Sequence, residues 1–233
     1  MKTTMLILSV LFFLLFAGKC SQEQTKTPEK PPILLVIGVD YSLTMTGYPE
    51  WDKNQYELVC YTMNQYNTEV SVCYRPVGNP INSGFQRLML NKIPAIDQSA
   101  VMSVRAKQKK EVDQISSKNT QAITEFINSI TVKSASDKKT CLNEFCNEVS
   151  ILVNEPQFSS YKKIVCLYSD GFPDCNGDNI NEKVLCSLPE EVTFCTIGWK
   201  NTDNIKHTGI QYHFSDIEGF ISFIKSQTLN QQK

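Results

Sequence analysis

The chain has 233 residues, of which 41% are hydrophobic and 20% are charged, and its net charge at pH 7 is −1. This length and balance fit one globular domain of about 200 residues that follows a short leader. The weak net charge lacks the basic footprint that nucleic-acid-binding proteins usually carry, so we expect no nucleic acid partner.

The N-terminal segment has the pattern of a targeting sequence. Lys2 supplies a positive charge, and the apolar run 5–17 is shorter than the roughly 20 residues that span a bilayer. The segment resembles a bacterial lipoprotein signal, in which a cysteine, here Cys20, becomes the lipidated first residue, although Lys19 stands where that signal usually has a small residue. We therefore predict a signal peptide over residues 1–19 and a membrane-anchored lipoprotein of the cell envelope. A periplasmic or secreted chain is the alternative if Cys20 is not lipidated.

The next residues indicate a linker and then a domain. Residues 20–32 contain three prolines and no hydrophobic pattern, which predicts a disordered tether. Residues 33–228 have the composition of a folded domain, and residues 229–233 form a polar tail.

The first strand of this domain ends in oxygen-bearing side chains. Residues 33–39 form a continuous apolar run rich in β-branched residues, which is typical of a strand buried on both faces of a parallel sheet. Asp40, Ser42 and Thr44 follow at a spacing of two. In open α/β sheets, ligands bind at the carboxyl ends of the strands, so these three residues are candidates for a binding site.

Helices and strands alternate over the rest of the chain. We expect helices over residues 55–66, 98–130 in two pieces, 141–153 and 217–226, and strands over 69–74, 85–90 at a sheet edge, 163–168, 192–199 and 211–214, with a loop over 75–84. This order predicts an α/β fold with a doubly wound, mostly parallel central sheet of about six strands flanked by helices.

Two more candidates lie near other element ends. The apolar strand over residues 163–168 runs directly to Asp170, and Thr140 precedes a helix, where a threonine is most often an N-cap. Carboxylates and hydroxyls are hard oxygen ligands, which suit Mg²⁺, Mn²⁺ or Ca²⁺ better than zinc.

Together these motifs resemble the von Willebrand factor type A domain over residues 32–227. That family opens with a buried strand and Asp-x-Ser-x-Ser, continues to a lone threonine before a helix, and then has a strand that ends in an Asp-Gly loop. The matching residues here are Asp40, Ser42, Thr44, Thr140 and Asp170, with Thr44 in place of the second serine.

The resemblance implies a metal-ion-dependent adhesion site and no catalytic residues. The hydroxyls of Ser42, Thr44 and Thr140 would hold a divalent cation, and Asp40 and Asp170 would bind it directly or through water. A carboxylate of a protein partner would complete the shell. From the residues alone, an alternative stays open in which these side chains only cap turns and helix ends.

The rival class is an enzyme. Haloacid-dehalogenase-like phosphatases also begin with a buried strand and an aspartate, so that Asp40 would be the nucleophile and Asp170 and Asp174 would form an acidic metal loop. Ser42 stands where those enzymes have their general acid, whose loss costs about 10²–10⁴-fold in rate. The residues therefore favour the binding module over the phosphatase. A structural lipoprotein with a vestigial site is the third possibility.

The nine cysteines fit an exported chain. Setting Cys20 aside leaves eight, an even number. Cys175 and Cys186 flank a loop and are candidates for a disulfide, whereas Cys166 and Cys195 lie in apolar strands, where a buried free thiol is the simpler expectation.

Overall fold

The computed structural model describes residues 30–49, 51–66, 68–78, 84–130, 140–172, 184–200 and 205–229. The chain divides into two compact units, Met1–Lys30 and Pro31–Lys233, and the description below concerns the second. The predicted signal peptide, Cys20 and most of the tether lie outside the described residues. Within those residues, no helix is both long enough and apolar enough to cross a membrane.

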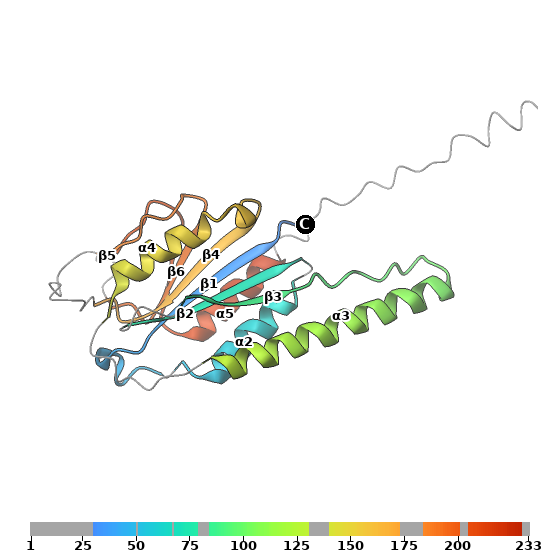
Figure 1. Ribbon diagram of the computed structural model, residues 1–233, viewed down its shortest axis with the longest axis horizontal. Coiled ribbons are helices and arrows are strands. Elements are labelled where there is room, and N and C mark those ends of the chain that lie inside the picture. Colours follow the sequence, from blue (N-terminus) through green and yellow to red (C-terminus); the bar gives the residue numbers. More distant parts are fainter. Residues whose placement is uncertain are drawn as a thin grey trace, which may run out of the picture. The chain divides into compact units, whose positions relative to one another are not determined.

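The second unit alternates strands and helices along the chain (Figure 1). The elements are β1 (Ile33–Asp40), the 3-10 helix η1 (Leu43–Met45), α2 (Lys53–Asn64), β2 (Val70–Val77), β3 (Gln86–Leu90), α3 (Met102–Ser129), α4 (Leu142–Val153), the 3-10 helix η2 (Pro156–Phe158), β4 (Lys162–Tyr168), β5 (Val184–Leu185), β6 (Thr193–Ile197), β7 (Ile205–Lys206), β8 (Gln211–Phe214) and α5 (Ile217–Leu229).

Six strands form the central sheet in the order β3-β2-β1-β4-β6-β8. All neighbours in this sheet pair in parallel except β2 and β3, which are antiparallel. The doubly wound, mostly parallel fold expected from the sequence is therefore confirmed, as is the edge position of β3. The short β5–β7 pair, which the sequence pattern did not indicate, forms a separate two-stranded sheet.

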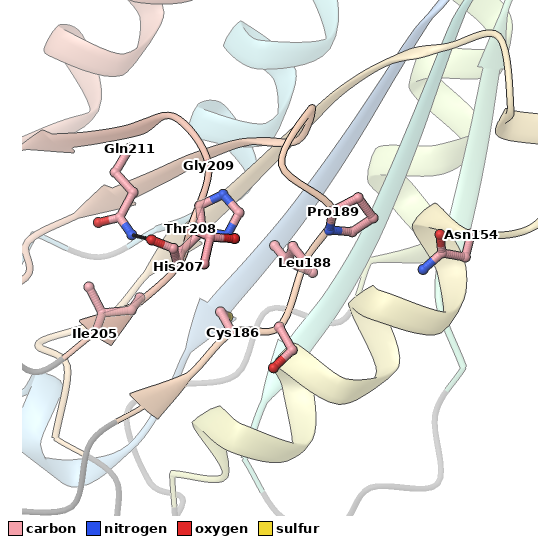
Figure 2. Close-up of a pocket in the computed structure, with 10 residues that line it drawn as sticks. Asn154, Cys186, Leu188, Pro189, Ile205, His207, Thr208, Gly209 and Gln211 are labelled. Carbon is pink, nitrogen blue, oxygen red and sulfur yellow. Dashed lines mark hydrogen bonds between the residues drawn. The ribbon is translucent and has the colours of Figure 1, made fainter.

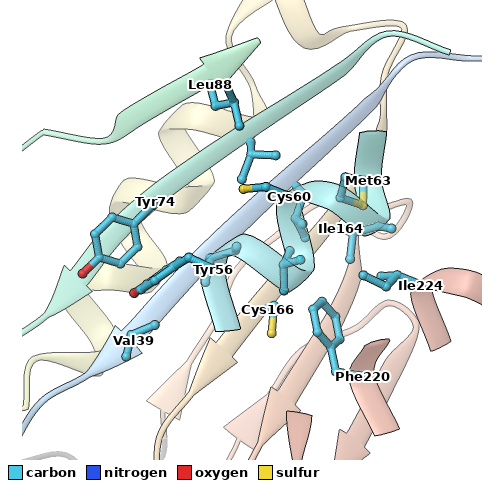
Figure 3. Close-up of a cluster of buried hydrophobic side chains, with 14 of the residues drawn as sticks. Val39, Tyr56, Cys60, Met63, Tyr74, Leu88, Ile164, Cys166, Phe220 and Ile224 are labelled. Carbon is cyan, nitrogen blue, oxygen red and sulfur yellow. The ribbon is translucent and has the colours of Figure 1, made fainter. Parts of the chain in front are cut away.

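Both faces of the sheet are covered, as the unbroken apolar run of β1 predicts. Ile33, Leu35, Ile37 and Val39 point into a core shared with α2, α3 and α5, part of which is drawn in Figure 3. Leu34 and Val36 point into a second core, which α4 and the β5–β7 pair cover. Burial on both faces explains why β1 lacks the polar alternation of a half-exposed strand.

Two element boundaries differ from the sequence expectation. β2 continues through Arg75 and Pro76, where a loop was expected. Because β3 pairs only as far as Tyr74, Pro76 needs no ladder hydrogen bond on that side. The region expected as two helical pieces from residue 98 is one 28-residue helix, α3, which begins at Met102.

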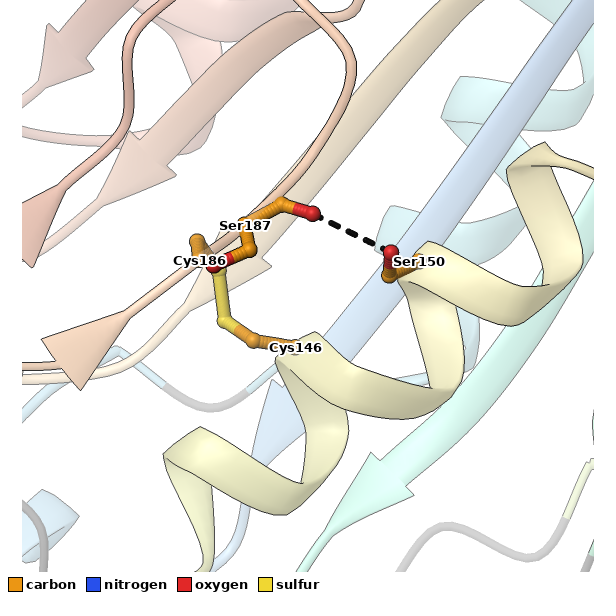
Figure 4. Close-up of a disulfide and its surroundings, with 4 residues drawn as sticks. All are labelled: Cys146, Ser150, Cys186 and Ser187. Carbon is orange, nitrogen blue, oxygen red and sulfur yellow. Dashed lines mark hydrogen bonds between the residues drawn. A yellow bond between two sulfur atoms is a disulfide. The ribbon is translucent and has the colours of Figure 1, made fainter.

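The predicted disulfide between Cys175 and Cys186 is wrong, because Cys186 is bonded to Cys146 of α4 (Figure 4). This bond ties α4 to the segment that follows β5. Cys141 is also disulfide-bonded, and Cys175 lies outside the described residues. The even number of cysteines does not mean that all of them form disulfides, because four buried cysteines are free: Cys60, Cys73, Cys166 and Cys195. The last two confirm the expectation of buried thiols in apolar strands.

Candidate functional site

The two candidate aspartates lie at the same edge of the sheet. β1 ends at Asp40, and its neighbour β4 ends at Tyr168, with Val39 opposite Tyr168 in the parallel register. Asp170 follows two residues later. Both aspartate side chains are 2% exposed, so two carboxyl groups are buried side by side where the strands leave the sheet.

The carboxyl group of Asp40 accepts hydrogen bonds from three other residues. Its Oδ1 accepts from the backbone N–H of Ser42 at 2.8 Å and from the hydroxyl of Thr140 at 3.4 Å. Its Oδ2 accepts from the hydroxyl of Ser169 at 2.7 Å. Sequence reasoning did not include Ser169 among the site residues, although its place directly before Asp170 at a strand end was the available signal.

The contact between Thr140 and Asp40 joins residues 100 positions apart. Thr140 is 1% exposed and does not cap α4, whose N-cap is Cys141 without a side-chain cap bond. The simple N-cap expectation for Thr140 is therefore wrong. Gly38 makes the contact possible, because a Cβ there would overlap the ring of Phe145 in the first turns of α4. The missing side chain lets α4 approach β1 closely enough to place Thr140 beside Asp40.

Ser42 and Thr44 form the outer part of the cluster. Their hydroxyls share a hydrogen bond of 2.9 Å. Ser42 is 3% exposed, whereas Thr44 lies at the surface in η1. The cluster therefore runs from a buried carboxylate to a solvent-facing hydroxyl, and Thr44 marks its open side.

The loop after β4 is held in one conformation around Asp170. The Asp170 N–H donates to Sδ of Met45 at 3.2 Å, and its Oδ1 accepts from the N–H of Phe172 at 3.1 Å. Gly171 has φ 84°, and a Cβ there would overlap the ring of Trp199. A glycine is required at this position both by the backbone conformation and by the space.

The site has an excess of buried negative charge. The pKa of Asp40 is raised from 3.8 to about 6, because burial and, to a smaller extent, the nearby Asp170 carboxyl raise it more than hydrogen bonds from Ser169 and Ser42 lower it. Among the described residues, the ion pairs join Arg75 to Glu148, Arg87 to Glu155 and Lys163 to Glu191, and none of them includes Asp40 or Asp170. A cation in this place would relieve the cost of burying the Asp40 carboxylate.

The donor set fits a hard divalent cation better than zinc. No three His, Cys, Asp or Glu side chains gather into a metal-binding group within the described part of the chain. A cation here would need hydroxyl ligands beside the two carboxylates, and the structure brings such hydroxyls to the site. The residues that the sequence singled out, Asp40, Ser42, Thr44, Thr140 and Asp170, do come together at one edge.

The burial and hydrogen bonding of Asp40 disfavour a role as a nucleophile. Both of its carboxyl oxygens accept hydrogen bonds from the chain, and its side chain is buried. A nucleophilic oxygen has to reach the reacting atom of a substrate. Asp174, the third acid of the phosphatase alternative, lies outside the described residues.

A separate cleft of about 860 Å³ lies on another part of the domain (Figure 2). It lies beside the Cys146–Cys186 disulfide, and its wall includes Leu188, Ile205 and His207. Nε2 of His207 is 3.1 Å from the carbonyl oxygen of Val192. No residue of the aspartate cluster lines this cleft, so the two features are distinct.

No protein-family model matches this sequence. No curated protein matches it either. Among solved structures, the chain is similar to the pilus adhesin SpaC from Lactobacillus rhamnosus GG, with a TM-score of 0.42 and 13% identity over 87% of this chain and 31% of that one. The chain thus spans about a third of the adhesin's length. It is also similar to the conserved hypothetical protein BatB from Bacteroides thetaiotaomicron (TM-score 0.40, 14% identity, 85% and 98% covered) and to the manganese-loaded TRAP protein of Plasmodium vivax (TM-score 0.39, 14% identity, 84% and 73% covered).

Proposed function

We propose that this chain is a binding module of the von Willebrand factor type A kind, which holds a divalent cation at the carboxyl edge of its sheet and uses it to bind a protein. The observation that carries the proposal is the environment of Asp40. This carboxyl is buried next to Asp170, accepts hydrogen bonds from Ser42, Thr140 and Ser169, and forms none of the ion pairs seen among the described residues.

The proposed ligands are Asp40, Ser42, Thr44, Thr140 and Asp170, and the proposed ion is Mg²⁺, with Mn²⁺ or Ca²⁺ as alternatives. A bound cation with few direct carboxylates would be electrophilic and would accept an oxygen from outside the chain. Asp40 and Asp170 supply the negative charge, and Ser42 and Thr140 supply hydroxyl oxygens from two different elements. The exposed position of Thr44 supports the approach of a partner carboxylate from that side.

The location of the protein is part of the proposal. We infer an exported chain, anchored to a membrane of the cell envelope through Cys20. The test is metabolic labelling of the full chain with a fatty acid analogue, with Cys20→Ser as the control variant. Equal labelling of both chains contradicts lipidation at Cys20.

Calorimetric titration of Mg²⁺ and Mn²⁺ into the purified full chain tests the metal site. We expect one site in the wild type and its loss in Asp40→Asn, which removes the charge and keeps the shape. Asp113→Asn is the matched control, because Asp113 is exposed on α3, away from the cluster. Absence of ion binding in the wild type, or equal binding in both variants, refutes the proposal.

A phosphatase assay on the same samples tests the rival function. We expect no ester hydrolysis by the wild type in either ion. Turnover that Asp40→Asn abolishes would establish the enzyme instead of the binding module.

A further inference from the structure

The longest helix projects beyond the body of the domain. α3 has 28 residues, but its fully buried side chains begin only at Asn119. The preceding part, residues 102–118, would extend about 25 Å at 1.5 Å per residue. Residues 91–101 run back along it from β3, and Figure 1 shows the two segments reaching away from the sheet together. We call residues 91–118 the arm.

The arm is a folded element with a defined base and tip. At the base, Oδ1 of Asn119 accepts from the backbone N–H of Asn91 at 3.0 Å, and its Nδ2 donates to the Asn91 carbonyl at 2.9 Å. Near the tip, Asp97 accepts from the N–H of Ser99 at 2.9 Å and donates its own N–H to Oε1 of Gln108 at 3.1 Å. These bonds hold the extended segment against the helix.

The tip of the arm is apolar and exposed. Eight large hydrophobic side chains are exposed among the described residues, and three of them lie within four positions here: Val101 at 68%, Met102 at 79% and Val104 at 44%. Val101 is the N-cap of α3 and makes no side-chain cap bond. A polar N-cap would stabilise the helix start by about 1 kcal/mol and would be better solvated. The helix start is thus poorly suited to water.

The arm is basic although the protein is not. Its six basic and three acidic side chains give a net charge of +3, whereas the whole chain carries −1. Five of the six basic residues are exposed lysines: Lys92, Lys107, Lys109, Lys110 and Lys118. No acidic residue lies in the first turn of α3, and Asp97, Glu111 and Asp113 offset only half of the six positive charges of the arm.

The arm leaves the sheet at the edge opposite the aspartate cluster. Leu90, at the end of β3, is opposite Val70, which is opposite Ile33, the first residue of β1. The chain enters the domain at this same edge, where the carbonyl of Pro32 accepts from the N–H of Lys162. Asp40 lies seven residues further along β1 than Ile33, about 23 Å away at the rise of a strand.

We propose that the arm docks on an anionic lipid surface. The aliphatic tip would enter the headgroup boundary, and the lysines would lie near the lipid phosphates. An exposed apolar tip flanked by lysines, at the edge where the leader joins the domain, fits a bilayer better than a protein partner of fixed shape. Docking would turn the cluster around Asp40 away from the membrane. The inference does not depend on metal binding.

The test uses tryptophan quenching in the full chain bound to vesicles with brominated acyl chains. The two native tryptophans, Trp51 and Trp199, are 2% and 8% exposed, so a new tryptophan in Met102→Trp reports on the tip. Ile151→Trp is the matched control, because Ile151 is 70% exposed on α4. Val101→Trp provides a second reporter at the tip.

We expect quenching of Met102→Trp in vesicles that contain phosphatidylglycerol, and much less in phosphatidylcholine alone or at high salt. Reversal of Lys107, Lys109 and Lys110 to glutamate should weaken docking by more than about 100-fold, since the loss of each lysine alone removes about fivefold near an anionic surface and each new carboxylate is repelled. Ile151→Trp should remain unquenched.

The opposite results overturn the proposal. No quenching at either tip reporter in any vesicle would show that the arm does not meet lipid, and a protein partner would then be the better explanation. Equal quenching at Ile151 would show that the leader alone brings the whole domain to the bilayer. Quenching that survives the charge reversal would remove the electrostatic basis.

Discussion

Removal of the charge of Asp40 should stabilise the ion-free protein while it abolishes ion binding. Asp40→Asn keeps the shape of the side chain and its acceptor for the Ser42 N–H and the Thr140 hydroxyl. It removes a buried carboxylate whose pKa is raised to about 6, mainly by burial. The Asp40 carboxylate would therefore lower the stability of the ion-free protein, and a bound cation would offset that cost.

The size of the expected stabilisation by Asp40→Asn follows from the pKa of Asp40. A rise from 3.8 to about 6 corresponds to about 3 kcal/mol of folding free energy lost when the group is ionised. The new amide would face Ser169, whose hydroxyl already accepts from the Gly171 N–H at 3.1 Å, and this rearrangement costs about 1 kcal/mol. The net gain is about 2 kcal/mol near neutral pH, or about 4–8 °C in melting temperature for a domain of this size.

The raised pKa of Asp40 also predicts how the stability difference between the wild type and Asp40→Asn changes with pH. The folded state holds the Asp40 proton more tightly than the unfolded state, so the penalty is complete above pH 6 and fades as pH falls from about 6 towards about 4. Denaturant unfolding in a chelator should therefore show the advantage of Asp40→Asn near neutral pH and a smaller one near pH 5. Addition of Mg²⁺ or Mn²⁺ should stabilise only the wild type.

Two results would refute this reasoning. Asp40→Asn could prove less stable than the wild type in chelator at neutral pH, which would mean that the carboxylate is stabilising without an ion. The difference between the two chains could also be independent of pH, which would mean that burial does not raise the Asp40 pKa.

Three further predictions concern the surroundings of the site and the arm. Gly171→Ala should cost roughly 2–4 kcal/mol in urea unfolding, because a left-handed backbone and an overlapping tryptophan ring both oppose a Cβ, whereas Gly84→Ala, with open space around it, should stay within about 0.5 kcal/mol; equal effects would contradict the geometry. Replacement of Cys146 and Cys186 by alanine should cost about 4 kcal/mol, since their bond closes a loop with a sequence separation of 40, and unchanged stability would show that the bond is not formed. Asn119→Ala should cost about 2 kcal/mol and speed hydrogen exchange at the base of the arm, because it removes two hydrogen bonds between a buried amide and the Asn91 backbone; unchanged exchange there would refute its role.

Local pattern was enough to predict the part of the site that belongs to the strands. The unbroken apolar run before Asp40 and the one before Asp170 indicate two strands buried on both faces. Parallel strands of this kind end at a common edge, and the structure brings the two carboxyls together there. The α/β class and the edge position of β3 follow from the same periodicities. These features are predictable because each depends on residues a few positions apart.

The contact of Thr140 with Asp40 and the pairing of the cysteines depended on packing between segments that are far apart in the chain. The hydrogen bond from Thr140 to Asp40 exists because α4 packs closely over Gly38. The residues around Thr140 do not distinguish it from an ordinary helix cap, so only the family resemblance placed it among the candidate site residues. Cys186 pairs with Cys146 because α4 lies beside the segment after β5, whereas spacing alone favoured Cys175. The sequence by itself determined which residues form the buried strands and which oxygen-bearing side chains lie at the ends of those strands. Only the tertiary structure decided which helix reaches those oxygens and which cysteines meet, because such pairings depend on packing between distant segments and leave no local periodicity.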